Sequence, residues 1–370
     1  MAGEAQRTSI TGRIEFVDTA RGIAMLCIVL GHLGVAPINY VVYTFHVPIF
    51  FLITGWFVSR QLGVSAFAKK RARTLLVPYA ATCVLIIATY VIRGAIGADG
   101  SRPAGEELIV WTVAALYGAG STGVPLPGPL QLFGTTLPVQ SIGAIWFLWA
   151  CFWGCVGLRA LLALKREWLR ALIALAVALF GVFSAQVFFA PLSLQPGCVA
   201  LGYMYLGYAA REYGWPWSQA WPRKAKTAAA VATGAVWVAY IFWRDTVVFV
   251  DAIPGLHWWS IFGILAGCVT VLVLSWLLTK SLPRVASPLR FLGKYSLIML
   301  CVHMLEMHVV NYSLLADAIM AAGAPYVVAG GCVLALKFTL IFVFTWLLAK
   351  WAPSRKLFGF PPAAAGEKRS

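Results

Sequence analysis

Apolar residues in this chain are grouped into long segments, and short polar or basic stretches separate each segment from the next. About ten segments reach the roughly 17 residues that a helix needs to cross the hydrocarbon core of a membrane. They cover residues 22–38, 41–58, 74–92, 142–158, 171–190, 193–210, 226–243, 258–279, 295–312 and 326–349. The pattern predicts an all-α integral membrane protein, a bundle of about ten transmembrane helices.

Composition agrees with this class, because 61% of the residues are hydrophobic and only 11% are charged. A net charge of +16 would fit a nucleic-acid-binding protein if the basic residues gathered on one solvated face. They lie instead in short clusters between the apolar segments. We therefore expect a membrane protein surrounded by lipid and no nucleic acid partner.

The basic clusters also predict the topology, because loops rich in lysine and arginine stay on the cytoplasmic side. If the N-terminus is cytoplasmic, 25 of the 29 lysines and arginines fall on that side. Only Arg93, Arg102 and Arg244 fall outside, and Lys337 lies within a predicted span. Both termini are therefore predicted to be cytoplasmic, in a multi-pass protein of the cell membrane.

The chain shows no internal repeat, and we expect three parts along it. Residues 1–21 form a polar cytoplasmic segment without the features of a signal peptide, residues 22–351 the transmembrane domain, and residues 352–370 a basic cytoplasmic tail. The long external loop 93–141 contains "EELIVWTVAALYG", which is too short to span and predicts an interfacial or re-entrant helix. A lid over an outward-facing site and a plain surface loop both fit this segment.

Arg21 and His32 stand at the two ends of the apolar stretch "RGIAMLCIVLGH". Eleven helical positions advance by about 1100°, or three turns plus about 20°, and rise about 16 Å. The arginine therefore lies at the cytoplasmic mouth, with the histidine on the same face near mid-membrane. Ionisable groups at that depth are candidates for function. A positive-inside anchor for Arg21 and a hydrogen-bonded structural role for His32 are the alternatives.

Two further spans carry histidines. In "FHVPIFFLITGWF", His46 lies in the outer half of the membrane, and Pro48 is expected to break the helix beside it. In "YSLIMLCVHMLEMHVV", His303 has Glu306 three positions later, one helical turn away. A carboxylate there can hold an imidazole in one tautomer and raise its basicity, as general-base catalysis requires. A buried pair that only fixes helix packing is the alternative.

The stretch "KKRARTLLVPY" places four cations before the third span: Lys69, Lys70, Arg71 and Arg73. Together with Arg21 they could form a cytoplasmic binding site for an anion. A positive-inside cluster beside anionic lipid explains the same residues.

The eight cysteines all lie in apolar segments and lack the spacing of metal ligands. Small buried thiols commonly pack between helices. We therefore expect no metal site.

These stretches, taken in order and together with "WFL" at 146–148, resemble the acyltransferase-3 family of membrane proteins, in particular the branch similar to fucose 4-O-acetylases. The resemblance implies a ten-helix bundle that moves an acyl group, usually acetyl from cytoplasmic acetyl-CoA, to a hydroxyl of a cell-envelope carbohydrate. The family's arginine and histidines fall on Arg21, His32 and His46, and its basic motif falls on Arg73. Thr54 stands where the family more often has serine, and both residues offer a hydroxyl.

The resemblance gives each candidate an expected role. Arg21 and Arg73, with their basic neighbours, would hold the phosphates of acyl-CoA, the acyl donor, and His32 would act as general base or carry the acyl group itself. His46 and the His303/Glu306 pair would bind the carbohydrate or glycolipid acceptor or relay the proton. The competing functions are a multi-span transporter of a lipid-linked sugar or small molecule, and a membrane receptor or scaffold.

Overall fold

The computed structural model describes residues 14–132, 135–214 and 218–360, and it confirms the all-α class. The model is 73% helical. The strands within the described ranges form one antiparallel hairpin in the loop that was predicted to be external, β1 (Leu130–Leu132) and β2 (Thr135–Leu137).

Every predicted apolar segment overlaps a helix. The α-helices are α1 (Glu15–Gly31), α2 (Ala36–Val42), α3 (Pro48–Trp56), α4 (Val64–Ala95), α5 (Ala104–Tyr117), α6 (Trp146–Leu161), α7 (Glu167–Ser184), α8 (Leu194–Ala209), α10 (Arg223–Trp243), α11 (Ser260–Ser281), α12 (Pro283–Lys294), α13 (Ser296–Val309), α14 (Tyr312–Ala321), α15 (Tyr326–Lys350) and α16 (Ala352–Leu357). A π-helix, η1 (Ala210–Gly214), extends α8, and a short 3-10 helix, η2 (Phe249–Asp251), lies between α10 and α11.

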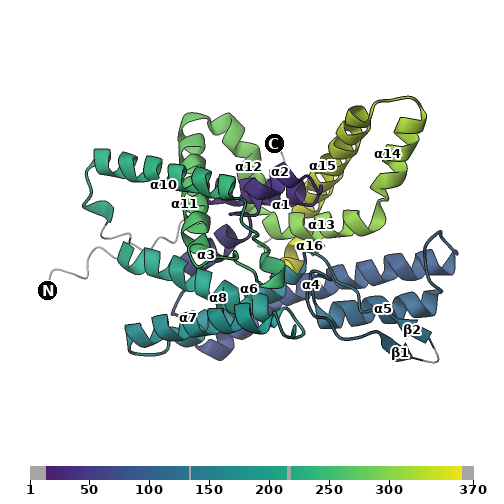
Figure 1. Ribbon diagram of the computed structural model, residues 1–370, viewed down its shortest axis with the longest axis horizontal. Coiled ribbons are helices and arrows are strands. Elements are labelled where there is room, and N and C mark those ends of the chain that lie inside the picture. The colour runs from purple at the N-terminus through teal and green to yellow at the C-terminus, as the bar shows by residue number, and fades with distance from the viewer. Residues whose placement is uncertain (1–13, 133–134, 215–217, 361–370) are drawn as a thin grey trace.

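Five helices of the described chain, α4, α7, α10, α11 and α15, are long and apolar enough to cross a membrane. A sixth span results if α12 and α13, which meet at a 75° bend, are counted as one. The helices cross at large angles: α4, α7 and α10 lie across the view of Figure 1, whereas α11 stands nearly upright. The count of ten spans and the cytoplasmic location of the termini stay predictions.

The first two predicted spans differ from the helices that form. Helix α1 begins at Glu15, before the predicted start at residue 22, and it ends at Gly31, where His32 caps it. Within the predicted second span, residues 41–58, α2 ends at Val42 and α3 begins only at Pro48, as Pro48 indicated, because proline at the first position of a helix has no N–H to donate. His32 and His46 therefore both lie at or beside helix ends, within irregular backbone.

Glycines set the closest helix contacts in the core. Gly22 and Gly293 lie where α1 crosses α12, and a Cβ at either position would overlap the backbone of the other helix. Gly55 and Gly207 play the same part between α3 and α8. In a membrane, where the hydrophobic effect does not drive helices together, small residues let helix backbones approach closely and pack by van der Waals contact. These crossings fix the position of α1, which carries Arg21 and His32.

The segment "EELIVWTVAALYG" forms the helix that was predicted for it, α5, which packs along α4. Trp111 of α5 stacks on Tyr90 of α4 with ring centroids 4.0 Å apart. The buried carboxylate of Glu107 accepts hydrogen bonds from the Trp111 ring and from the amide of Arg102. These contacts hold α5 firmly against α4.

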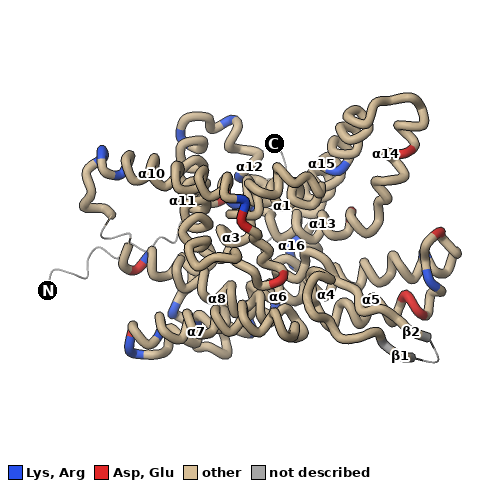
Figure 2. Tube along the Cα trace, viewed as in Figure 1, with Lys and Arg blue, Asp and Glu red and all other residues tan. Residues whose placement is uncertain are grey.

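Charged residues lie mostly at helix ends and in the connections, while most of the trace is uncharged (Figure 2). Residues 1–13 of the predicted N-terminal segment and 361–370 of the predicted tail lie outside the described residues. The tail begins as the helix α16. There the buried Arg355 donates hydrogen bonds to the carbonyl of Ala349 and the hydroxyl of Tyr295.

The connection between α10 and α11 is held in place by one carboxylate. Asp245 Oδ1 accepts hydrogen bonds from the amides of Thr246 and Leu256, at 2.8 and 3.1 Å. Asp245 Oδ2 accepts from the hydroxyls of Tyr240 and Ser260. The pKa of Asp245 would rise through burial alone, but the hydrogen bonds, first that of Ser260, leave the pKa below its usual value.

Replacement of Asp245 by asparagine should destabilise the protein, because an amide NH₂ in place of Oδ2 cannot accept the two hydroxyls. A buried hydroxyl that loses its hydrogen-bond acceptor costs the folded state about 1–3 kcal/mol. A lowered folded-state pKa contributes stability above the unfolded pKa of about 3.9 and loses it as pH falls through the folded pKa. Thermal unfolding in detergent should therefore separate wild type from Asp245→Asn at pH 7, with a smaller difference below about pH 4. An equal melting temperature at pH 7 would show that Asp245 does not hold the connection.

Candidate functional site

A cavity of ≈ 110 Å³ lies beside the ends of α1 and α2, between α6 and the α10–α11 connection. His32 and His46 both line it. The other lining residues are Ile28, Tyr43, Val47, Ala144, Trp146, Phe147, Val247, Val248, Phe249, Val250 and Leu300. Residues 247–250 close the cavity from the α10–α11 side, and α5 contributes no lining residue. Of the two readings of the α5 segment, a lid and a plain surface loop, the lining residues of this cavity therefore favour the second.

The two histidine rings that line the cavity are held in the same way. His32 Nδ1 lies 2.7 Å from the carbonyl oxygen of Ile28, and His46 Nδ1 lies 2.6 Å from that of Val42. A carbonyl oxygen only accepts, so Nδ1 carries the hydrogen in both neutral rings. The lone pair of each ring is then on Nε2, the nitrogen that a base would use.

His303 connects His32 to a carboxylate. His303 Nε2 lies 3.4 Å from His32 Nδ1, and the two rings meet edge to face with centroids 5.1 Å apart. On its other side, His303 Nδ1 donates to Glu306 Oε1 at 2.9 Å. The i+3 contact predicted in α13 is therefore present. The structure extends it to His32, whose one Nδ1 hydrogen is shared between the Ile28 carbonyl and His303 Nε2, so three of the predicted residues form one hydrogen-bonded chain.

Two residues with no predicted role complete this chain. Lys337 Nζ, on α15, lies 2.7 Å from Glu306 Oε1, and the hydroxyl of Tyr312 donates to Glu306 Oε2. Lys337 is 4% exposed and also lies over the ring of Tyr312. A lysine in the middle of an apolar span was a visible signal, by the same reasoning that selected His303. Tyr312 gave no such signal, because tyrosine is common at the ends of membrane helices.

The basic residues near the start of α4 separate into two groups. Lys69, Lys70 and Arg73 are exposed, whereas Arg71 is half-buried. Arg71 and Arg21 both lie within electrostatic range of Cys151 on α6. The structure therefore brings Arg71 to the same part of α6 as Arg21, and it leaves the other three cations on the surface.

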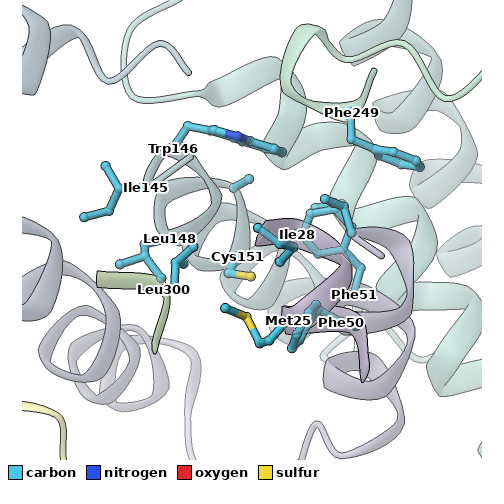
Figure 3. Packing of buried hydrophobic residues seen from close by; sticks show 14 of the residues in the cluster. Met25, Ile28, Phe50, Phe51, Ile145, Trp146, Leu148, Cys151, Phe249 and Leu300 are labelled. Atoms are coloured by element: carbon cyan, nitrogen blue, oxygen red, sulfur yellow. The ribbon is translucent and has the colours of Figure 1, made fainter. Parts of the chain in front are cut away.

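Buried apolar side chains fill the space along α1 between Arg21 and His32. Met25 and Ile28 are 2% and 6% exposed, and they pack near Cys151 and Leu300 (Figure 3). Helix α1 is continuous through this region, so positions 4 and 7 after Arg21 share the face that carries Arg21 and His32. Arg21 is not a lining residue of the cavity. A path from the arginine to the histidine therefore requires these two side chains to move.

Comparison with known proteins identifies the family. Residues 14–350 match the acyltransferase domain of the acyltransferase-3 family. The chain belongs to this family. The sequence resemblance to the acyltransferase-3 family is thus confirmed.

A curated relative of the chain is nodulation protein NolL of Mesorhizobium japonicum, 25% identical over 198 residues. That similarity covers 48% of this chain and 42% of the relative, so the chain spans less than half of the relative's length. No solved structure matches the chain. Among the residues that the structure describes, no group of three or more His, Cys, Asp or Glu side chains could hold a metal ion.

The ion pair between Lys337 and Glu306 gives a stability prediction. Lys337→Met should leave the carboxylate buried without its cation, which costs about 3–5 kcal/mol when a buried pair loses one partner. The double variant Lys337→Met/Glu306→Gln should regain most of that loss, because no net charge then stays buried. Thermal unfolding in detergent measures both, with Lys350→Met, on the exposed end of the same helix, as the matched control. Equal losses in the single and double variants would show that the two charges are not coupled.

Proposed function

We propose that this acyltransferase moves an acyl group, most simply acetyl, from cytoplasmic acyl-CoA to a hydroxyl of a cell-envelope carbohydrate or glycolipid. The observation that carries the proposal is the chain from Glu306 through His303 to His32, which leaves His32 Nε2 as the lone-pair nitrogen. His32 also lines the cavity. A carboxylate and a second imidazole behind a histidine are what a general base needs for a fixed tautomer and orientation.

In the proposed reaction His32 Nε2 removes the proton of the acceptor hydroxyl as its oxygen attacks the thioester carbonyl. The new ester C–O bond forms, the C–S bond breaks, and the CoA thiolate takes the proton back from His32. The hydrogen bond from His32 Nδ1 to the Ile28 carbonyl keeps Nε2 free, while His303 and Glu306 stabilise the imidazolium that forms. In the variant mechanism, His32 Nε2 attacks first and holds the acyl group until the acceptor arrives.

The donor would approach from the end of α1 that carries Arg21. Guanidinium groups match phosphate geometry, and the pairing of Arg21 with the half-buried Arg71 around α6 supports a phosphate site there. The exposed Arg73, Lys69 and Lys70 would attract the polyanionic donor at longer range. The pantetheine arm then reaches His32 after Met25 and Ile28 move aside.

The acceptor would be held at the opposite end of the cavity. His46 Nε2 carries the second lone pair in this cavity, where it can accept a hydrogen bond from the acceptor or take its proton. The ring of Tyr43 packs against His46 with centroids 5.1 Å apart and limits its movement. A cavity this small supports a short acyl group.

Loss of the His32 imidazole should abolish transfer. Purified His32→Ala protein in lipid vesicles should release CoA from acetyl-CoA about 10²–10⁴ times more slowly than wild type, the usual contribution of a general base. His257→Ala, on the α10–α11 connection, is the histidine control. Normal turnover by folded His32→Ala would exclude His32 as the base. Movement of a sugar without consumption of CoA would instead point to transport.

The two groups of cations give a separate prediction for the donor. Arg21→Gln and Arg71→Gln should each raise the KM for acetyl-CoA by about 10-fold or more, as expected for the loss of a charge-assisted hydrogen bond. Arg73→Gln should change the KM much less, because its side chain is exposed. Steady-state kinetics with a fixed acceptor concentration measure all three. A larger effect at Arg73 than at Arg71 would refute this division of the cluster.

A further inference from the structure

The α10–α11 connection carries two aspartates in opposite situations. Both oxygens of Asp245 accept hydrogen bonds from its own connection and from α10 and α11. Asp251, six residues later, has a buried Oδ1 with no hydrogen-bond partner in the described part of the chain. Burial raises the pKa of Asp251, although a hydrogen bond from Ser121 lowers it in part. Asp245 therefore has a complete structural role, and Asp251 does not.

Asp251 follows a residue of the cavity that contains the two histidines, although its own side chain is not part of the lining. The preceding residue, Val250, lines that cavity, and Asp251 ends the 3-10 helix η2. The backbone around it is fixed, since Val248 and Ile253 exchange two backbone hydrogen bonds, of 2.8 and 3.0 Å. The backbone that carries the Asp251 carboxylate is thus a short turn closed by hydrogen bonds.

The connection between α5 and α6 packs against the turn that carries Val250 and Asp251. Gly120 packs so closely on Trp146 and Val250 that a Cβ there would overlap both side chains. At Gly123 a Cβ would lie 3.3 Å from Asp251 Oδ2. Two glycines therefore bring a second piece of backbone against Asp251 at the edge of the cavity, next to Trp146 in its lining.

A buried carboxylate oxygen without a partner is costly for the folded protein. The penalty for an unsatisfied buried polar group is about 1–3 kcal/mol, and more for a charged one. Native proteins pair nearly all such groups, and each exception needs an explanation, such as a bound water or ion or a catalytic role. A carboxylate accepts only, so this partner must be a donor.

We infer that Asp251 binds the acceptor, taking a hydrogen bond from a hydroxyl next to the one that is acylated. The inference rests on the proposed function and adds an acceptor subsite to it. A polyhydroxylated ligand such as a carbohydrate places hydroxyls on neighbouring carbons, so one can enter the cavity towards His32 while the next donates to Asp251 Oδ1. Asp251 then determines which hydroxyl of the sugar reaches the base.

The test combines two measurements on Asp251→Asn and Asp251→Ala. The first is thermal unfolding in detergent without acceptor, where both variants should be as stable as wild type or more stable. The second is steady-state transfer from acetyl-CoA to the best-used member of a panel of methyl glycosides. There the KM for the glycoside should rise about 10-fold or more, while the KM for acetyl-CoA and its slow hydrolysis without acceptor stay unchanged. Asp99→Asn, at an exposed aspartate, is the matched control and should match wild type in both.

The outcomes separate this inference from the proposed function. An unchanged glycoside KM in active Asp251→Ala overturns the acceptor subsite and leaves the acyltransferase mechanism in place. A fall in melting temperature like that of Asp245→Asn also overturns it, because Asp251 would then be structural. If wild type transfers acetyl to no member of the panel and releases no CoA, the proposed function itself fails.

Discussion

The ion pair between Glu306 and Lys337 is the contact on which the arrangement of the site depends. Two opposite charges, each almost completely buried, tie α13 to α15 in a region where neither could stay alone. With its oxygens engaged by Lys337 and Tyr312, the carboxylate is fixed and in turn orients the ring of His303. His303 reaches across to α1, so the position of His32 relative to the cavity is set from three helices.

Helix ends do the rest of the positioning. The C-terminus of α1 leaves the Ile28 carbonyl available to the His32 ring, and the interruption between α2 and α3 places His46 on the same cavity. Irregular backbone at membrane depth is tolerated where it is buried in protein or lines a cavity. The breaks in these helices are therefore part of how the chain brings two imidazoles together, and the glycine crossings of α1 with α12 and of α3 with α8 keep them there.

Local features of the site could be predicted from the sequence, and long-range ones could not. The break at Pro48, the helix over residues 104–117 and the contact of His303 with Glu306 all follow from rules that act within a few residues. The partnership of Lys337 with Glu306 depends on how α15 packs on α13, and no spacing encodes that. The same holds for the α10–α11 connection, whose Val247–Val250 stretch closes the cavity. Between Arg71 and Arg73 only tertiary packing decides which guanidinium turns inward.

Met25 and Ile28 have a consequence for the membrane as an electrical barrier. The proposed function takes one reactant from each side of a bilayer, and such a reaction endangers the ion gradients that the cell maintains across it. With these two side chains packed between the arginine and the histidine, the polar ends of α1 are separated by dry, low-dielectric material that small ions do not enter. Methionine is unbranched and flexible, so its side chain can swing aside for a thin substrate without movement of the helix. Under the proposed function, the two residues that pack between Arg21 and His32 would therefore also insulate one compartment from the other between turnovers.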